Sequence, residues 1–171
     1  MERILVTADI HGSLSTWLTV RALLGEKDGL AVAGDLFDTR YGHYGHPDFR
    51  PEDIRSDLKQ FPHPFYYVYG NCDVSGFCPG YDREKTFHAF GKSVFIHHGH
   101  RPVPAGCSAD IIIQGHTHLC HLEEKDGTIF INPGSITHPR NQLATYGWID
   151  PSGVRLVDLK TGNPIVAIPF N

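Results

Sequence analysis

The stretch Ile4-Leu5-Val6-Thr7-Ala8-Asp9-Ile10-His11-Gly12 joins an apolar run to a polar turn flanked by glycine. The apolar run predicts a buried strand, and Asp9 and His11 come where that strand ends. Residues two positions apart on an extended segment project to the same side, so both side chains can bind one ligand. Open sheets hold their ligands at the ends of their strands, so this stretch predicts both a sheet and a site.

Five further motifs along the chain repeat this arrangement, each at the end of a hydrophobic run. They are Gly34-Asp35, Gly70-Asn71-Cys72-Asp73, His97-His98-Gly99-His100, Gly115-His116-Thr117-His118 and Asn132-Pro133-Gly134-Ser135. Carboxylate, imidazole and carboxamide groups together form a ligand set for two divalent metal ions. The motifs therefore predict a two-metal site at the rim of the fold.

The first half of the chain alternates strand and helix patterns. Strands are predicted over 4–6, 30–33 and 65–69, and helices are predicted to begin after Ser13 and at Pro51. Strands that alternate with helices indicate a parallel sheet with right-handed crossovers. The first half is therefore expected to form an α/β layer.

The second half consists of short strands with few helical signals between them. These strands are predicted over 94–96, 111–113, 129–131, 146–149 and 154–157. Asp126-Gly127 and Ser152-Gly153 are expected to be hairpin turns. All five strands are assigned to a second, mixed or largely antiparallel sheet packed on the first. The expected fold class is α/β, with two packed mixed β-sheets, a β-sandwich, flanked by helices.

The overall composition is that of an ordinary globular protein. The chain has 171 residues, of which 40% are hydrophobic and 20% charged, so we expect a single domain over residues 1–171. No apolar run approaches the length of a membrane span, and the first strand begins too early for a cleavable signal. We therefore expect no membrane partner, a cytoplasmic location and reduced thiols at all four cysteines.

The net charge and the loops bear on possible partners. A formal net charge of -4 without a basic run predicts no stable nucleic-acid binding. The polar segment from Thr39 to Arg50 is expected to form a loop over the site. Substrate specificity is assigned to this loop and to the segment from Gly76 to Lys85. Exposed aromatic side chains could form a homodimer interface; the candidates are Tyr41, Tyr44, Phe77 and Tyr81.

The ordered motifs resemble those of the calcineurin-like metallophosphoesterase superfamily, DxH, GD, GNH, GH and GHxH. The match runs from Asp9 to His118. Asn132-Pro133-Gly134-Ser135 and Pro139-Arg140 narrow it to a group of small bacterial and archaeal phosphodiesterases. The resemblance implies helices, two sheets and helices stacked in layers. It also implies two ions, with Mn²⁺ favoured and Fe, Ni, Co or Zn as substitutes.

The resemblance further implies which residues bind each ion. One ion would be held by Asp9, His11, Asp35 and His118. The other would be held by Asp35, Asn71, His98 and His116, with Asp35 bridging both. The implied activity is hydrolysis of small phosphodiesters or nucleotide-like substrates by a hydroxide that bridges the ions, with Asn71 and His98 also counted as catalytic.

The chain departs from the superfamily pattern at Cys72, where much of the superfamily has a histidine that protonates the leaving group. A thiol is a poorer proton donor than imidazolium, so we expect modest turnover and a preference for acidic leaving groups. A water or His100 could supply the proton instead. Cys72 could equally be a small buried apolar residue, and His100 a solvated loop residue.

Other interpretations remain open beside the enzyme. Asp and Asn favour turns at strand ends, so the motifs could be turn chemistry with chance histidines. A protein-binding scaffold is a second alternative, since the retromer subunit of this superfamily has altered metal motifs. Within the fourth motif, His98 is taken as the ligand, and His97 is expected to face the opposite side of its strand.

Overall fold

A six-stranded sheet is built around the strand that precedes Asp9. The computed structural model describes residues 1–170. The strand Ile4–Thr7 (β1) pairs in parallel with Gly29–Val32 (β2), which pairs in parallel with Phe65–Tyr67 (β3). On its other side β1 pairs antiparallel with Thr145–Asp150 (β9). The sheet continues through Gly153–Asp158 (β10) and Pro164–Pro169 (β11), giving the order β11-β10-β9-β1-β2-β3.

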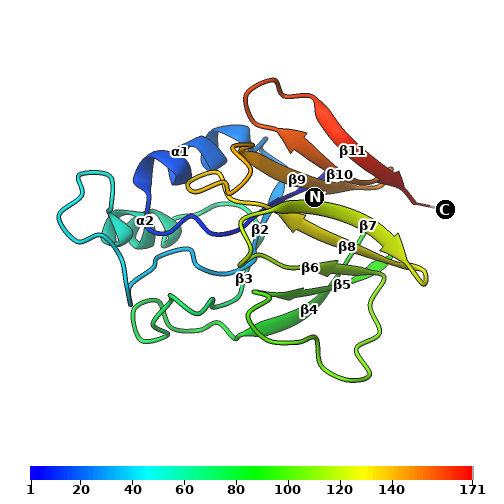
Figure 1. Ribbon diagram of the computed structural model, residues 1–171, viewed down its shortest axis with the longest axis horizontal. Coiled ribbons are helices and arrows are strands. Elements are labelled where there is room, and N and C mark those ends of the chain that lie inside the picture. Colours follow the sequence, from blue (N-terminus) through cyan, green and yellow to red (C-terminus); the bar gives the residue numbers. More distant parts are fainter. Residues whose placement is uncertain (171) are drawn as a thin grey trace.

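The second sheet has five strands and contains the isoleucine-rich segments of the chain. Its order is β4-β5-β6-β8-β7. Lys92–His97 (β5), Ile111–Ile113 (β6) and Thr128–Pro133 (β8) run parallel. Glu84–Ala89 (β4) and Cys120–Lys125 (β7) pair antiparallel at the two edges. Each sheet therefore contributes three parallel strands (Figure 1).

Apolar side chains fill the space between the two sheets. Val6 and Ala31 from the first sheet share a buried cluster with Ile96, Ile113 and Ile131 from the second. Gly147 of β9 lies directly against the second sheet, because a Cβ there would come within 2.6 Å of Ile131 Cδ1, and within 3.1 Å of Val6 Cβ on the neighbouring strand. The inter-sheet distance at this point thus depends on the absence of a side chain.

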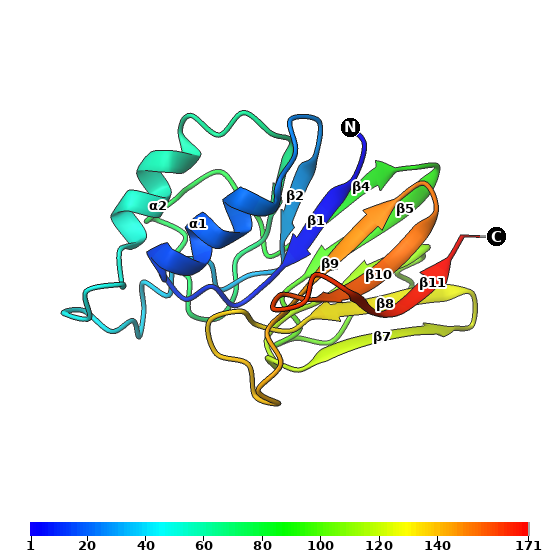
Figure 2. The same cartoon turned by 90° about the horizontal axis from the view of Figure 1, so that it is seen from above.

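Helices Leu14–Leu23 (α1) and Pro51–Leu58 (α2) cover the outer face of the six-stranded sheet, where they lie side by side (Figure 2). Trp17 and Ile54 bury their side chains there. The Ser13 hydroxyl accepts the Thr16 amide hydrogen and caps α1. Within residues 1–170, no helix is long and apolar enough to cross a membrane.

The outer face of the second sheet is covered by a loop. Phe95 and Ile112 point to this face, where Val103, Ala109 and Cys107 pack against them. Within residues 1–170 both helices lie on the other sheet, so the second helical layer that the resemblance implied is replaced here by this loop. The predicted pair of packed mixed sheets is confirmed.

The assignment of strands to sheets was wrong in one respect. The segments 146–149 and 154–157 were expected in the second sheet, but β9 and β10 belong to the first. Hydrophobic periodicity shows that a strand is buried, and it does not reveal which strand is its partner. The hairpin turn predicted at Asp126-Gly127 joins β7 to β8. The turn predicted at Ser152-Gly153 lies one residue earlier, over Pro151 and Ser152, because Gly153 already pairs with Asp150 as the first residue of β10.

Three strands were not predicted, and all lie at sheet edges: β4, β7 and β11. Much of their length is exposed, so they lack the apolar runs that marked the inner strands. The third strand ends at Tyr67, earlier than predicted, and a single bridge joins Val68 to Asp82. Its Tyr67 side chain faces the helical side, while Tyr66 stacks on Phe87 of the other sheet.

The contact between Gly147 and Ile131 supplies a test of the packing. We expect Gly147→Ala to lower the free energy of unfolding by about 1–2 kcal/mol, since overpacked cores relax only partly. Ile131→Val alone should cost about 0.5–1.5 kcal/mol. The double variant should cost less than the sum, because valine lacks the Cδ1 atom that the new methyl group would meet. Equilibrium denaturant unfolding measures all three, and strictly additive costs would contradict the packing described.

Candidate metal centre

The six polar motifs meet at one end of the two sheets. Asp9, Asp35 and Asn71 follow the parallel strands β1, β2 and β3. His98 and His116 follow β5 and β6, and the segment from Asn132 to Ser135 runs from the end of β8. The carboxyl ends of parallel strands share one edge, so each sheet delivers three motifs to a common rim.

The backbone at this rim is held in an unusual conformation. Five of the seven predicted ligands have positive φ angles: Asp9 (55°), His11 (52°), Asp35 (49°), His116 (70°) and His118 (59°). Each non-glycine residue in this region costs about 1–2 kcal/mol. Strain of this kind persists only where the surrounding structure imposes it, and it gathers at functional sites.

The motif glycines allow the close approach of side chains from neighbouring strands. A Cβ on Gly70 would lie 1.9 Å from Asp35 Oδ1, and a Cβ on Gly34 would lie 2.4 Å from His98 Nδ1. Any larger residue at either position would push a predicted ligand away from the rim. Gly34 and Gly70 are therefore required for the geometry of the site.

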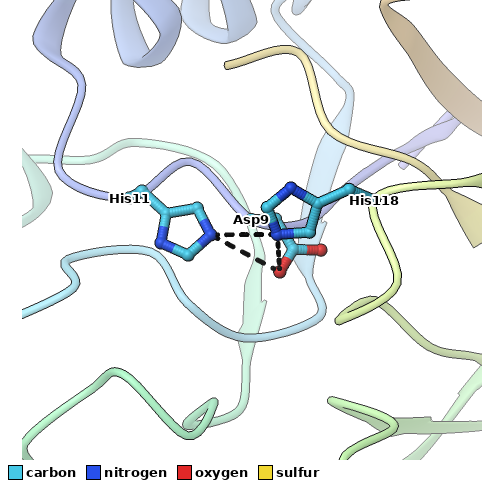
Figure 3. A group of neighbouring side chains, drawn as sticks. All are labelled: Asp9, His11 and His118. Atoms are coloured by element: carbon cyan, nitrogen blue, oxygen red, sulfur yellow. Dashed lines mark hydrogen bonds and ion pairs between the residues drawn. The ribbon is translucent and has the colours of Figure 1, made fainter. Parts of the chain in front are cut away.

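Asp9, His11 and His118 form a first group of ligand atoms (Figure 3). His118 Nε2 lies 3.4 Å from Asp9 Oδ1 and 3.2 Å from His11 Nε2, and His11 Nε2 lies 3.8 Å from Asp9 Oδ1. The opposite nitrogens have partners of their own. His11 Nδ1 lies 3.0 Å from Asp38 Oδ2, and His118 Nδ1 lies 2.9 Å from the carbonyl oxygen of His138.

These contacts fix the tautomers of both rings. If each Nδ1–H donates to its oxygen, both Nε2 atoms present lone pairs to each other and to the carboxylate. Asp9 is fully buried, and within residues 1–170 its Oδ1 has no hydrogen-bond partner. A buried carboxylate oxygen facing two lone pairs is unfavourable unless a cation lies among them. The donor set therefore fits a divalent metal ion.

Asp35, Asn71 and His98 form a second group beside the first. His98 Nε2 lies 3.1 Å from both Asp35 Oδ2 and Asn71 Oδ1, and 4.0 Å from Asp9 Oδ1. His98 Nδ1 lies 2.8 Å from the Ala33 carbonyl oxygen, which again directs Nε2 inward. Asp35 Oδ1 accepts the Cys72 amide hydrogen at 2.8 Å.

The electrostatics of the two groups favour positive charge at the rim. Burial alone would lower the pKa of His98, but the hydrogen bond and charge of Asp35 outweigh it and raise that pKa. The nearby carboxylate of Asp9, with Oδ1 3.4 Å from His118 Nε2, raises the pKa of His118. Burial works to raise the pKa of Asp35, yet the contacts with His98 and Cys72 bring it down to about 2. Protons and metal ions would therefore compete for the same nitrogens.

His116 is the least constrained of the predicted ligands. Its amide donates to Asp9 Oδ2 at 2.9 Å, which fixes the carboxylate. Its ring centroid lies 5.1 Å from that of His98 and 6.2 Å from that of His100. All seven predicted ligands thus come together at the rim, and their roles as ligands stay predictions.

Cys72 and His100 lie beside these groups. The Cys72 thiol accepts a hydrogen bond from Asn71 Nδ2, and burial, followed by the charge of Asp35, raises its pKa. Burial and the nearby His98, Arg101 and Arg83 lower the pKa of His100. Both groups are therefore neutral at neutral pH. His97 packs against Phe95, on the outer face, as expected.

Several supporting residues were missed or left without a role. Asp38, which holds His11, lies in a segment read only as a loop. Buried Asp73 accepts hydrogen bonds from the Phe37 and Gly70 amides and from the Tyr67 hydroxyl. The GNCD motif contained Asp73, but the spacing gave no sign of a buried acceptor.

The trailing motif acts as a brace for two ligand loops. Asn132 Nδ2 donates to the Gly115 carbonyl oxygen at 2.8 Å and to Thr117 Oγ1 at 3.0 Å. Ser135 Oγ donates to the Asp9 carbonyl oxygen at 2.8 Å. The rigid turn predicted over Asn132 to Ser135 therefore holds the loops that carry Asp9, His116 and His118.

Residues 2–153 match the sequence profile of the calcineurin-like phosphoesterase superfamily domain. The chain belongs to this superfamily and is thus a hydrolase of phosphoester bonds. Phosphodiesterase YfcE of Escherichia coli (strain K12) is 25% identical over 183 residues, covering 100% of both chains. A structure of YfcE, a phosphoesterase from E. coli, superposes with a TM-score of 0.82 at 25% identity, over 99% of this chain and 100% of that one.

Two further relatives extend the comparison. A probable metallophosphoesterase of Mycoplasma pneumoniae (strain ATCC 29342 / M129 / Subtype 1) is 30% identical over 175 residues, covering 93% of this chain and 96% of that protein. Vps29 from Entamoeba histolytica, solved in complex with zinc, has the same fold. Its TM-score is 0.66 at 21% identity, over 99% of both chains.

The raised pKa values predict how metal-free protein responds to pH. Protonated His98 and His118 stabilise the folded state below their ordinary pKa of about 6.5. With a chelator present, the free energy of unfolding should fall as the pH rises above about 6.5, through the raised pKa values of these two histidines. Added Mn²⁺ should abolish this fall, because the ion replaces the protons.

Asp9→Asn is the matched control for this pH series. It removes the charge that raises the pKa of His118, so the fall in chelator should become shallower. Denaturant unfolding at each pH gives the free energies. Equal slopes for the wild type and Asp9→Asn would contradict the electrostatics described.

Proposed function

We propose that this protein is a phosphodiesterase that uses two divalent metal ions, with small phosphodiesters as substrates. The observation that carries the proposal is the convergence of carboxylate oxygens and imidazole nitrogens at one rim, from Asp9, His11, Asp35, His98 and His118, with Asn71 Oδ1 beside His98 and the His116 ring 5.1 Å from that of His98. The whole-length likeness to the phosphodiesterase YfcE supports the diester as substrate class. Mn²⁺ is the favoured ion, with Fe, Ni, Co or Zn as substitutes.

The residues that would hold the ions divide into two sets. Asp9, His11 and His118 would hold one, and Asn71, His98 and His116 the other, with Asp35 shared. When bound, such ions supply charge that stabilises a phosphoryl group under attack and a nucleophile at neutral pH. The chain's own part is to fix these ligands: Asp38 orients His11, and the carbonyl groups of Ala33 and His138 orient His98 and His118.

The protein provides little assistance to the leaving group. The Cys72 thiol holds its proton tightly, and its direct partner is the Asn71 carboxamide. Neutral His100 carries no proton that it readily gives to an alkoxide. A leaving group that is stable as its own anion needs no such donor, so substrates with acidic leaving groups should react fastest.

The remaining proposals concern the domain organisation, cellular location and partners of the protein. We propose that residues 1–171 act as one domain in the cytoplasm, where the four free thiols would stay reduced. The net charge of -4 disfavours stable nucleic-acid binding. Tyr41 and Tyr44 are both 67% exposed and could serve a homodimer, whereas Phe77 and Tyr81 pack against the core.

A protein-binding scaffold of the same fold is the second candidate. A scaffold needs no strained backbone and no buried, unpartnered carboxylate oxygen. Retention of all these costly features argues for the enzyme.

Hydrolysis of bis-p-nitrophenyl phosphate tests the proposed activity. We expect Mn²⁺-dependent release of p-nitrophenol that a chelator stops. Asp35→Asn and His98→Ala should each lower kcat/KM at least about a hundredfold, since each removes a ligand of the centre. Lys125→Gln, at the far end of β7, should leave it unchanged. Faster hydrolysis of p-nitrophenyl phosphate would overturn the diesterase assignment, and no hydrolysis of either would favour the scaffold.

Replacing Cys72 tests the account of the leaving group. Cys72→His should raise kcat on diesters with alkyl leaving groups by about tenfold and change kcat on nitrophenyl diesters little. Cys72→Ser should leave both rates close to those of the wild type. The measurement is kcat against leaving-group pKa, whose slope should flatten only in the histidine variant. An unchanged slope, or a loss of activity, would count against this account.

A further inference from the structure

A cleft of about 520 Å³ opens beside the second ligand group. It is lined by Asp82, Arg83, Glu84 and the segment from His97 to Pro102, which includes Arg101. His98 belongs both to this lining and to the second ligand group, where it contacts Asp35. The cleft therefore adjoins the second ligand group through His98.

Arg83 lies at the start of β4, beside the end of β5. Glu84 stands opposite His97 in the antiparallel pairing of these two strands, and Arg83 precedes Glu84 directly. Arg83 and His98 therefore both lie just beyond the paired residues, at the same end of the two strands, and both line the cleft.

Arg83 is also held close to the third motif. The carbonyl oxygen of Asp82 accepts the Tyr69 amide hydrogen at 2.8 Å, which joins the start of β4 to the segment just before Gly70 and Asn71. Arg101 follows His100 and lines the same cleft. The two arginines therefore come to one cleft from different segments of the chain.

Neither guanidinium group has a carboxylate within ion-pair distance among the described residues, although Asp82 and Glu84 also line the cleft. Arginine forks match the geometry of phosphate, and an unpaired pair of them at a cleft wall leaves that capacity free.

We infer that this cleft binds a second phosphate group on the substrate, with Arg83 as its principal contact and Arg101 as a further one. The inference rests on the proposed function and narrows it: the substrate is a phosphodiester with one substituent that carries an additional phosphate. The scissile phosphorus lies at the metal centre, and the additional phosphate lies beyond His98. Arg83 is a specificity residue in this scheme and takes no part in the bond cleavage.

Two probes with the same leaving group test the inference kinetically. One is the p-nitrophenyl ester of thymidine 5′-phosphate, and the other carries a further phosphate at the 3′ position. Wild-type protein with Mn²⁺ should show a KM about tenfold lower for the second probe, the gain expected from one charge-assisted contact. Arg83→Gln should remove this preference by raising KM for the phosphorylated probe alone, with kcat kept.

Lys125→Gln is the matched control, because it removes one positive charge from the opposite end of the same sheet. It should retain the wild-type preference. Arg101→Gln should reduce the preference in part. Equal losses of Arg83→Gln on both probes would place Arg83 at the scissile phosphate and overturn the inference, as would a wild type without any preference.

A binding measurement separates the failure of this inference from the failure of the proposed function. Calorimetry in chelator compares thymidine 3′,5′-bisphosphate with thymidine 5′-monophosphate and needs no turnover. The bisphosphate should bind about tenfold more tightly to wild type and to Lys125→Gln, and equally weakly to Arg83→Gln. If neither probe is hydrolysed but this difference in binding is present, the phosphodiesterase proposal fails and the phosphate site stands. Equal binding of both nucleotides would overturn the phosphate site.

Discussion

The buried carboxylate of Asp9 is the constraint on which this end of the molecule depends. An isolated charge in the interior costs several kcal/mol unless it is paired. Asp9 Oδ2 has the His116 amide, but Oδ1 faces the Nε2 atoms of His11, His118 and His98 at 3.8, 3.4 and 4.0 Å. When the three Nδ1 atoms donate to their oxygens, acceptors converge here on a space that contains no donor. Only protons or metal ions can make such an arrangement favourable. The pKa values of His98 and His118 are raised for this reason, because a proton on either ring is stabilised by the nearby carboxylates.

Packing of the two sheets and hydrogen bonds between the loops keep these acceptor atoms close together. Both sheets deliver ligands, so the site exists only while the sheets remain packed on each other through residues such as Val6 and Ile131. Within the rim, Asp73 holds the loop after Asp35, and Asn132 and Ser135 hold the loops of His116 and Asp9. These hydrogen bonds offset the free-energy cost of the positive φ angles at the ligand residues. A centre assembled in this way would bind metal with little rearrangement.

The sequence predicts most of this centre because each ligand lies beside a local signal. An apolar run followed by a glycine and a polar residue marks a strand end, whatever sheet the strand later joins. Partners distant in the chain carry no such signal. β9 reads as a buried strand, but nothing local shows that it pairs with β1. Edge strands such as β4 are too polar to stand out. The position of Arg83 beside the end of β5 depends on the pairing of β4 with β5, which the sequence does not show. Asp38 was missed for the same reason, since its role depends on a histidine 27 residues away.

The shape of the rim supports the proposal of a diester rather than a monoester as substrate. The second ligand group adjoins the cleft of Arg83 and Arg101. The first group opens to another cleft, of about 330 Å³, which His43, His46 and Phe49 of the segment from Thr39 to Arg50 line together with His11 and His118. A phosphorus atom bound between the two groups would have open space on both sides. A monoester has one substituent and would leave one of these clefts filled with water, whereas the two substituents of a diester can occupy both. The cleft walls also differ, since one carries free guanidinium groups and the other carries imidazoles and an aromatic ring, so the two substituents of the substrate should be chemically unlike.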